Sequence, residues 1–227
     1  MTTVGIITAR GQSKQLARKN LRLLAGRPLL AHTIEAARGA RSLDRVVVTT
    51  DDAAIARAAI VAGAEVPFMR PAELASDVAA SVDAVRHAVA QLEAAGDSID
   101  IVVTLQPTSP FRSAAHIDAA VDLLRRRDAD SVVTVASLDI PISVLGYLDD
   151  DAFVRLAEVS DVRRQAAPRS VRLTGAIYVT RRALLDEGRL VGDRPIALEL
   201  EGTAAIDIDT AEDLAHARSI ARRGRRR

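Results

Sequence analysis

VGIITARGQSKQLARKN (residues 4–20) joins a short apolar run to a stretch crowded with positive charge. The run at 4–9 is almost entirely apolar, which is typical of a strand buried on both faces of a sheet. Five cations follow it closely: Arg10, Lys14, Arg18, Lys19 and Arg22. In sheets of parallel strands, ligands bind beyond the carboxyl ends of the strands. The stretch therefore predicts an α/β fold whose first loop carries a binding site.

The alternation of strand and helix patterns continues to residue 137. Further strands are predicted at 44–50, 64–69, 100–106 and 131–137. Helical spacing of apolar residues predicts helices at 27–40, 52–63, 81–96 and 115–128, the third of them capped by Ser81. Strands that alternate with helices form parallel βαβ units with right-handed crossovers. We therefore expect a doubly wound, mostly parallel sheet.

The rhythm breaks between residues 138 and 174, where prolines, aspartates and arginines replace the alternating pattern. We expect this segment to be an inserted arm within a single domain that spans residues 1–227. Beyond the break, the patterns predict three strands and a final helix at 175–180, 195–200, 204–209 and 210–223. A long irregular segment inside a compact domain has little core of its own, so a second surface should order it. This predicts a homodimer in which the arm crosses to the partner.

Composition excludes several classes of protein. The 227 residues include no cysteine, so disulfides and thiolate metal sites are absent. Five of the 31 cations lie in the last six residues, which we interpret as a solvated helix end; the other 26 face 30 acidic residues. A mildly acidic body argues against nucleic-acid binding. No apolar run approaches the ~20 residues of a membrane span and no signal peptide is visible, so we expect a cytoplasmic protein without a membrane partner.

The first loop matches none of the common phosphate-binding motifs. The sequence contains no G-x-G-x-x-G and no G-x-x-x-x-G-K-[ST], and GQSKQ lacks the second glycine of a nucleophile elbow. What the loop offers is one glycine, small polar side chains and cations. Backbone amides together with Arg and Lys side chains can surround a triphosphate. A solvated basic loop is the other interpretation, and the local pattern does not choose between the two.

The motif IDIDT (206–210) alternates isoleucine and aspartate. Because side chains alternate across a strand, Asp207 and Asp209 are expected on one face. Two carboxylates at a strand end suit Mg²⁺, which completes its octahedron with phosphates and water. The alternative is an ordinary half-exposed strand in which Asp209 or Thr210 caps the following helix.

Six motifs together resemble a known family. They occur in the order IITARGQSKQLARKN, VVVTTDD, RPAELASD, LQPTSPFR, GAIYV and IDIDTAEDL, and span essentially the whole chain. The acylneuraminate cytidylyltransferases, or CMP-sialic acid synthetases, have similar motifs in the same order. The resemblance implies a GT-A-like nucleotidyltransferase fold, a homodimer, and the use of CTP and Mg²⁺. It further implies that an acidic, sialic acid-like sugar is converted to its CMP derivative and that pyrophosphate is released.

The resemblance also assigns roles by position. It places CTP among Arg10, Ser13, Lys14, Lys19, Asn20, Arg70 and Ser81. Lys19 would lie near the reacting phosphate, and Lys19, Arg10 and Asp209 would carry the catalytic step. The acceptor sugar would meet Gln106, Tyr178 and, from the arm, Arg164 and Gln165, a pair that family members extend across the dimer interface. Asp207 and Asp209 would bind the metal.

Several positions depart from the family pattern. In the first loop Thr8, Gln12 and Gln15 replace a proline and two glycines, so the loop must have another shape or carry strain. On the acceptor side Ser143 stands where a lysine is usual and Thr174 where an asparagine is usual, and an aromatic pair is missing. Alternatives are therefore another acidic acceptor such as an octulosonate or a phosphonate, another nucleotide, or an inactive nucleotide-binding homologue. Intact Lys19, Asp207 and Asp209 argue against the last.

Overall fold

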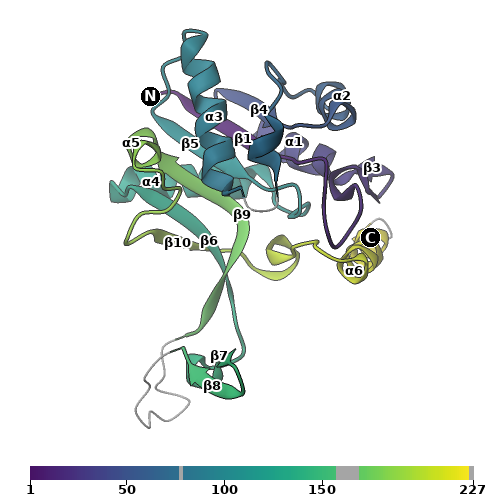
Figure 1. The fold of residues 1–227 in the computed structure, drawn as a ribbon, viewed down its shortest axis with the longest axis vertical. Helices are drawn as coiled ribbons and strands as arrows, with labels where there is room; N and C mark the ends of the chain where they lie inside the picture. Colours follow the sequence, from purple (N-terminus) through teal and green to yellow (C-terminus); the bar gives the residue numbers. More distant parts are fainter. Residues whose placement is uncertain (77–78, 157–168, 225–227) are drawn as a thin grey trace.

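A six-stranded sheet forms the centre of the computed structural model, which describes residues 1–76, 79–156 and 169–224 (Figure 1). The strand order is β10-β6-β9-β5-β1-β4. The strands are β1 (Thr3–Thr8), β4 (Arg45–Thr49), β5 (Ile101–Leu105), β6 (Ser131–Ser137), β9 (Val171–Arg181) and β10 (Ile196–Glu199). Only β9 is antiparallel to its neighbours, β5 and β6. The predicted mostly parallel sheet is confirmed.

Helices cover both faces of this sheet. On one face lie α1 (Leu29–Gly39), α2 (Ala53–Val61) and α4 (Ala114–Arg127), and on the other lie α3 (Ser81–Ala94) and α5 (Arg182–Asp186). The stripe predicted from helical spacing, Ile117, Val121 and Leu124, is fully buried in the larger apolar cluster. Apolar residues repeat every three to four positions in such helices because one side packs on the sheet. The doubly wound arrangement is therefore confirmed.

Two predicted strands are wrong. In the segment 64–69 only Glu65 pairs, through a single bridge to Val47, because Pro67 has no amide hydrogen with which to continue a ladder. In place of a strand at 204–209 the structure has a short 3₁₀ helix, η4 (Gly202–Ala205), and an extended segment. The Ile208 amide donates to the Thr108 carbonyl, so this segment is tied to the loop after β5.

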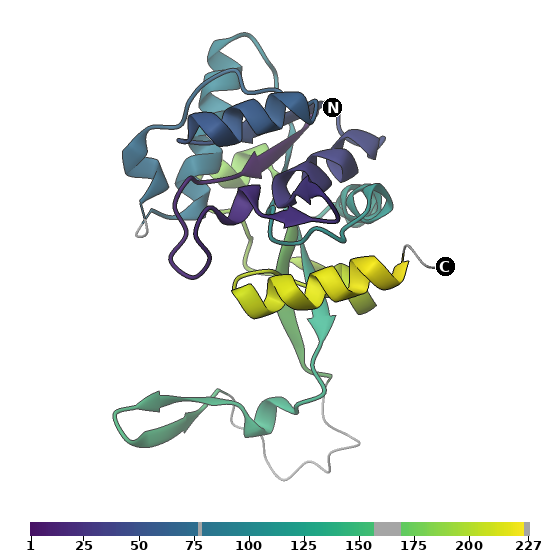
Figure 2. The ribbon, with the colours of Figure 1, turned by 90° about the vertical axis from the view of Figure 1, so that its right-hand side faces the viewer.

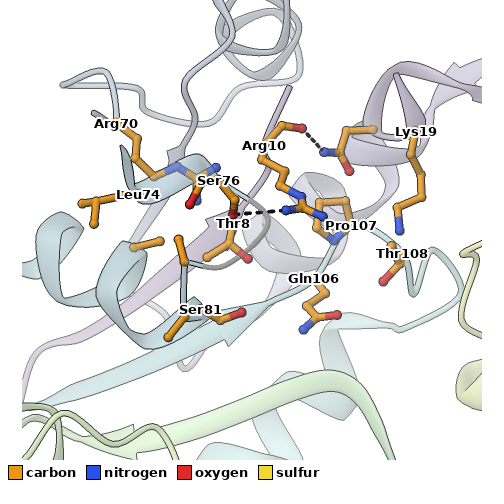
Figure 3. A pocket seen from close by; sticks show the side chains of 14 residues that line it. Thr8, Arg10, Lys19, Arg70, Leu74, Ser76, Ser81, Gln106, Pro107 and Thr108 are labelled. Atoms are coloured by element: carbon orange, nitrogen blue, oxygen red, sulfur yellow. Dashed lines mark hydrogen bonds between the residues drawn. The ribbon is translucent and has the colours of Figure 1, made fainter. Parts of the chain in front are cut away.

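The predicted cap of α3 is also wrong. Ala80, with extended backbone, holds the capping position and supplies no side-chain hydrogen bond. Ser81 is instead the first residue of the helix. Its hydroxyl is thus not used as a cap and lies at the mouth of the cleft described below (Figure 3).

The final helix, α6 (Ala211–Gly224), packs against the small hairpin of β2 (Leu23–Leu24) and β3 (Arg27–Pro28). Figure 2 shows α6 in yellow beside this purple hairpin. A third apolar cluster joins them and contains Leu16, Leu24, Leu29, Ile208, Leu214 and Ala217. The cluster anchors the end of the IDIDT motif against the N-terminal loop. None of the helices in the described residues is long and apolar enough to cross a membrane.

The described part of the arm lies away from the sheet. Beyond the body β6 and β9 continue as a pair, with Ser137 opposite Val171, and lead to a hairpin of β7 (Gly146–Asp149) and β8 (Ala152–Arg155) (Figures 1 and 2). A 3₁₀ turn, η3 (Ile142–Val144), precedes this hairpin. Apolar side chains are exposed along the segment: Ile140, Ile142, Val144, Tyr147, Leu148, Phe153, Leu156, Val171 and Leu173. The arm thus presents apolar surface without covering it.

Candidate active site

A cleft of ≈ 330 Å³ opens beyond the carboxyl ends of β1 and β5 (Figure 3). Its walls come from the loop after β1 with η1 (Lys19–Leu21), from η2 (Ala72–Ala75), from the start of α3 and from the loop after β5. The lining residues are Thr8, Arg10, Lys19, Asn20, Arg70, Leu74, Ser76, Ala79, Ala80, Ser81, Ala84, Gln106, Pro107 and Thr108. Six residues predicted to bind CTP or the acceptor therefore meet in one cleft: Arg10, Lys19, Asn20, Arg70, Ser81 and Gln106.

Three cations line the cleft: Arg10, Lys19 and Arg70. Arg10 donates to the Ser76 carbonyl at 3.3 Å. Arg70 is buried, and its Nη2 atom lies 3.6 Å from Asp51 Oδ1. Burial lowers the pKa of Arg70, the Asp51 carboxylate opposes this, and nearby Arg10 adds to the lowering. Among the described residues, Arg70 Nε and Nη2 find no hydrogen-bond partner, so an anionic ligand would supply what this buried guanidinium lacks.

The shape of the first loop is fixed at both ends. The Gly11 amide donates to Asp51 Oδ1 at 2.9 Å, and a Cβ atom at Gly11 would lie 2.9 Å from Asp52 Cβ. At the other end, Asn20 Nδ2 donates to the Arg10 carbonyl at 2.9 Å. These contacts hold Arg10 and η1 next to each other at the end of β1.

The loop carries no strain at the two positions where glutamine replaces glycine. Gln12 and Gln15 do not adopt positive φ; Arg18 does, at φ 53°, directly before Lys19. A non-glycine residue in this left-handed region stores strain. Ser13 and Lys14, which were predicted to bind CTP, do not line the cleft in this conformation.

The carboxylate pair lies beside the cleft. Lys19 Nζ is 2.7 Å from Asp209 Oδ1, although 190 residues separate them in the chain. Thr210 caps α6, since its hydroxyl accepts from the Asp213 amide. The capping role therefore belongs to Thr210, and Asp209 pairs with the predicted phosphate-binding lysine.

Asp207 is the less exposed member of the pair. Its Oδ1 atom is inaccessible to solvent and receives no hydrogen bond of ordinary geometry from the described residues. Burial raises the pKa of Asp207; the Thr108 hydroxyl opposes the rise, Asp209 adds to it, and Lys19 opposes it. A buried carboxylate oxygen without a donor, beside a second carboxylate, fits a divalent cation that draws its other ligands from phosphate and water. The described residues hold no group of three metal-ligating side chains.

The residues predicted for the acceptor are only partly brought together. Gln106 lines the cleft, whereas Tyr178 lies on β9 opposite Thr104 and is not part of the lining. Burial raises the pKa of Tyr178, and the Asp207 charge adds to the rise, so its ring lies on the side of the carboxylate pair. Arg164 and Gln165 lie outside the described residues.

Sequence reasoning missed two residues that organise the site. Asp51 holds both Gly11 and Arg70; two acids directly after a buried strand, in VVVTTDD, were the available signal. Arg112 is buried and donates to the Ala176 carbonyl at 2.6 Å and to Thr33 Oγ1 at 2.7 Å. Burial lowers the pKa of Arg112 to about 9. Nothing in a loop rich in proline and serine indicates that its arginine points inward.

A mostly parallel sheet with cations and a carboxylate pair gathered beyond strand ends suits a nucleotidyltransferase. The family model described as cytidylyltransferase matches residues 4–186. The chain belongs to this family.

Relatives of similar length support the same assignment. The chain is 33% identical to CMP-N,N'-diacetyllegionaminic acid synthase of Legionella pneumophila over 95% of this chain and 94% of that protein. It is 29% identical to pseudaminic acid cytidylyltransferase of Campylobacter jejuni, over 97% and 96% of the two chains. The resemblance to acylneuraminate cytidylyltransferases and their relatives is thus confirmed.

A solved structure supports the fold. The structure of CMP:2-keto-3-deoxy-manno-octonic acid synthetase complexed with CTP superposes with a TM-score of 0.77 over 99% of this chain and 100% of that chain. The sequence identity between the two is 19%, so this likeness speaks for the architecture alone.

Proposed function

We propose that this protein is a CTP-dependent cytidylyltransferase that converts an acidic sugar of the nonulosonate type to its CMP derivative and releases pyrophosphate. One observation carries the proposal: Arg10, Lys19 and Arg70 meet in a single cleft, and Lys19 contacts Asp209 of the carboxylate pair beside it. The relatives named above act on legionaminic and pseudaminic acids, which favours a nine-carbon acidic acceptor.

The chemistry requires little from the protein besides positioning and charge. A hydroxyl of the acceptor attacks the α-phosphorus of CTP, a new O–P bond forms, and the bond to pyrophosphate breaks. Fixed cations stabilise the charge that develops on the phosphates, because they need no reorganisation during the reaction. Arg10, Lys19 and Arg70 supply these cations, and the amino end of α3 adds its backbone amides.

We further propose that Asp207 and Asp209 hold Mg²⁺ when CTP is bound. The metal would neutralise phosphate charge and orient the triphosphate. Before CTP binds, Lys19 forms an ion pair with Asp209. We expect Lys19 to turn from this carboxylate to a phosphate when the nucleotide enters, since both charges would then have new partners.

The acceptor is expected at the Gln106 end of the cleft, with Tyr178 on the side of the carboxylates and with Arg164 and Gln165 reaching it from the arm. An octulosonate, a phosphonate or a different nucleotide would use the same cations, so these stay as alternatives. An inactive homologue is disfavoured because the cations and both carboxylates are present together.

We also propose that the protein is a homodimer and acts in the cytoplasm. Exposed apolar side chains along the arm support the dimer, because a water-facing patch of this kind gains free energy when a second protein surface covers it. Sedimentation of the purified protein tests the dimer, and cell fractionation tests the location.

The function is tested by a screen for pyrophosphate release. CTP, UTP, ATP and GTP are each combined with legionaminate, pseudaminate, N-acetylneuraminate, an octulosonate and a small phosphonate, with Mg²⁺ and with excess chelator. We expect release with CTP and a nonulosonate only, and none with chelator. Equal turnover of UTP, or full activity in chelator, would contradict the proposal.

A further inference from the structure

A large bulge in β9 lies directly beyond the end of β5. On the β6 side, Val133 pairs with Tyr178 and Val135 pairs with Leu173. Residues 174–177 of β9 therefore form an arch between these two pairs, where β6 has a single residue. On the β5 side, Leu105 pairs with Ile177. Because the next residue after Leu105 is Gln106, the arch of β9 meets the cleft at this side chain.

Gly175 forms the contact between the arch and Gln106. Its φ of +71° is one that L side chains rarely adopt, and a Cβ atom there would lie 3.2 Å from Gln106 Oε1. Glycine is therefore required at this position for two reasons: the backbone has a positive φ, and a side chain would have too little space beside Gln106. The side-chain amide of Gln106 rests against this glycine and points into the cleft (Figure 3).

Two buried threonine hydroxyls hold the arch. Thr174 Oγ1 donates to Thr134 Oγ1 at 2.7 Å, and Thr134 Oγ1 accepts from the Ile177 amide at 3.0 Å. Thr174 Oγ1 also accepts from the Ala176 amide at 3.3 Å. A bulge removes backbone groups from the sheet ladder, and buried backbone groups need other partners. The hydroxyls supply those partners.

Arg112 joins the arch to the backbone of Gln106. Its Nη1 atom donates to the Ala176 carbonyl at 2.6 Å and to the Gln106 carbonyl at 3.2 Å. Thr33 Oγ1 accepts from its Nη2 atom. Within the described residues Arg112 forms no ion pair with a carboxylate and does not line the cleft. A buried cation that binds only carbonyls and a hydroxyl serves to hold backbone in place.

We infer that Thr134, Thr174 and Arg112 are positioning residues that set the Gln106 amide for the acceptor sugar. The inference rests on the proposed function, because it assigns the acceptor to this end of the cleft. The proposed nucleotide ligands lie on other elements, the loop after β1, η1 and the start of α3. Loosening the arch should therefore weaken acceptor binding and leave CTP binding unchanged.

The kinetic test compares Thr174→Val and Thr134→Val with Thr180→Val. Thr180 is a buried threonine of the same strand whose hydroxyl donates to the Leu190 carbonyl at 2.7 Å, remote from Gln106. We expect the acceptor KM to rise about tenfold in the first two variants, because buried backbone groups lose their partners. The CTP KM should stay within about twofold, Thr180→Val should change neither constant, and Thr174→Ser should restore the acceptor KM.

A double variant separates positioning from general loosening. If Thr174 acts through Gln106, Thr174→Val should add almost nothing to the acceptor KM once Gln106→Ala is present. An equal rise of both KM values in Thr174→Val, or an undiminished effect in the Gln106→Ala background, would overturn the inference.

A measurement without turnover keeps this inference distinct from the proposed function. The side-chain NH₂ resonances of Gln106, assigned by loss in Gln106→Ala, are recorded in the ligand-free protein. We expect them to shift in Thr174→Val and Thr134→Val, and to stay in place in Thr180→Val. Unmoved resonances would refute the positioning role even if the enzyme is active. Shifted resonances in a protein that releases no pyrophosphate with any acceptor would refute the proposed function and keep the positioning network.

Discussion

The cleft and the arm differ in the kind of side chain that each buries or exposes. In and beside the cleft, charged groups are packed into the body: Arg70 is buried, Asp207 Oδ1 is inaccessible to solvent, and Lys19 is held against Asp209. In the arm, apolar side chains such as Leu148 and Phe153 face water. Charged groups are therefore held away from water in the cleft, and apolar groups face water in the arm. Both environments are unfavourable for the groups they hold. The difference supports the two proposals made above, that a small charged ligand completes the cleft and that another protein surface covers the arm.

The largest effect is expected from breaking the carboxylate pair. Asp209→Ala should lower kcat by about a thousandfold or more, since removal of a single group that stabilises phosphate charge commonly has effects of this order. The fold should be kept because Asp209 is half exposed and Thr210 caps α6. Pyrophosphate release and circular dichroism check this. Glu212→Ala, an exposed carboxylate in the first turn of the same helix, is the control and should be as active as the parent.

The next effect compares two lysines of the first loop. Lys19→Met should lower kcat by about a hundredfold, because Lys19 lines the cleft, while Lys14→Met should lower it less than about tenfold because Lys14 does not. Both variants remove one positive charge from the same loop, so a general effect of net charge is matched. Equal losses in the two variants would mean that the loop rearranges around CTP and brings Lys14 to the phosphates.

The residues proposed for the acceptor come from both regions, and their departures from the family pattern should reduce the use of N-acetylneuraminate. A cation is lost at Ser143, and the aromatic pair is missing. Together these should lower kcat/KM for N-acetylneuraminate about a hundredfold relative to the best acidic acceptor. The panel of acceptors with CTP measures it. If N-acetylneuraminate proves best, at about 10⁴ M⁻¹s⁻¹ or above, these substitutions do not set specificity.

Charged side chains in the cleft are expected to support ligand binding, whereas a charge introduced into the arm is expected to disrupt dimer formation. Leu148→Glu should weaken dimer formation about tenfold to a hundredfold, because it places a carboxylate in an apolar contact. Val61→Glu, which replaces an even more exposed apolar residue on α2, should leave the dimer intact. Sedimentation over a range of concentrations gives the dissociation constants. A protein that is monomeric before mutation, and active, would contradict the role given to the arm.

The smallest effect concerns stability. Burial raises the pKa of Asp207, so folding favours its protonated form. The stability contributed by this group is therefore present below the ordinary pKa and is lost as pH rises through the raised value. At neutral pH Asp207→Asn should raise the melting temperature of the ligand-free protein by about 2–4 °C. The gain should shrink as the pH falls toward the ordinary pKa of an aspartate, and it should be absent in Asp209→Asn, where the carboxylate is exposed and paired with Lys19.

Much of the fold could be predicted because parallel strands covered on both faces leave apolar runs in the sequence. Those runs located β1, β4, β5 and β6. They could not show that β9 runs antiparallel between β5 and β6, since strand direction depends on how the arm returns the chain. They also misplaced 204–209, whose alternating pattern arises from contact with the loop after β5 and not from a sheet.

The site was predictable in its residue types and only partly in its geometry. Cations after the first strand and an alternating aspartate pair were visible one by one, but their contact, Lys19 with Asp209, spans the whole chain. The position of Arg112 in the site could not be predicted, because its contacts are with carbonyls that the arch of β9 brings near it. Short-range sequence patterns show which chemical groups are present, whereas tertiary contacts decide which of them lie next to each other.

The central place of β9 has a consequence for synthesis on the ribosome. Ile101 of β5 pairs with Arg181 of β9, so about 80 residues must emerge before β5 gains its second neighbour. At typical elongation speeds this takes on the order of ten seconds. In the later part of that time β5 presents an unpaired edge while apolar side chains of the arm are also outside the exit tunnel. The nascent chain passes through a stage in which both surfaces can bind other chains, so a holding chaperone should raise the yield of folded enzyme more than a lower final concentration of protein does.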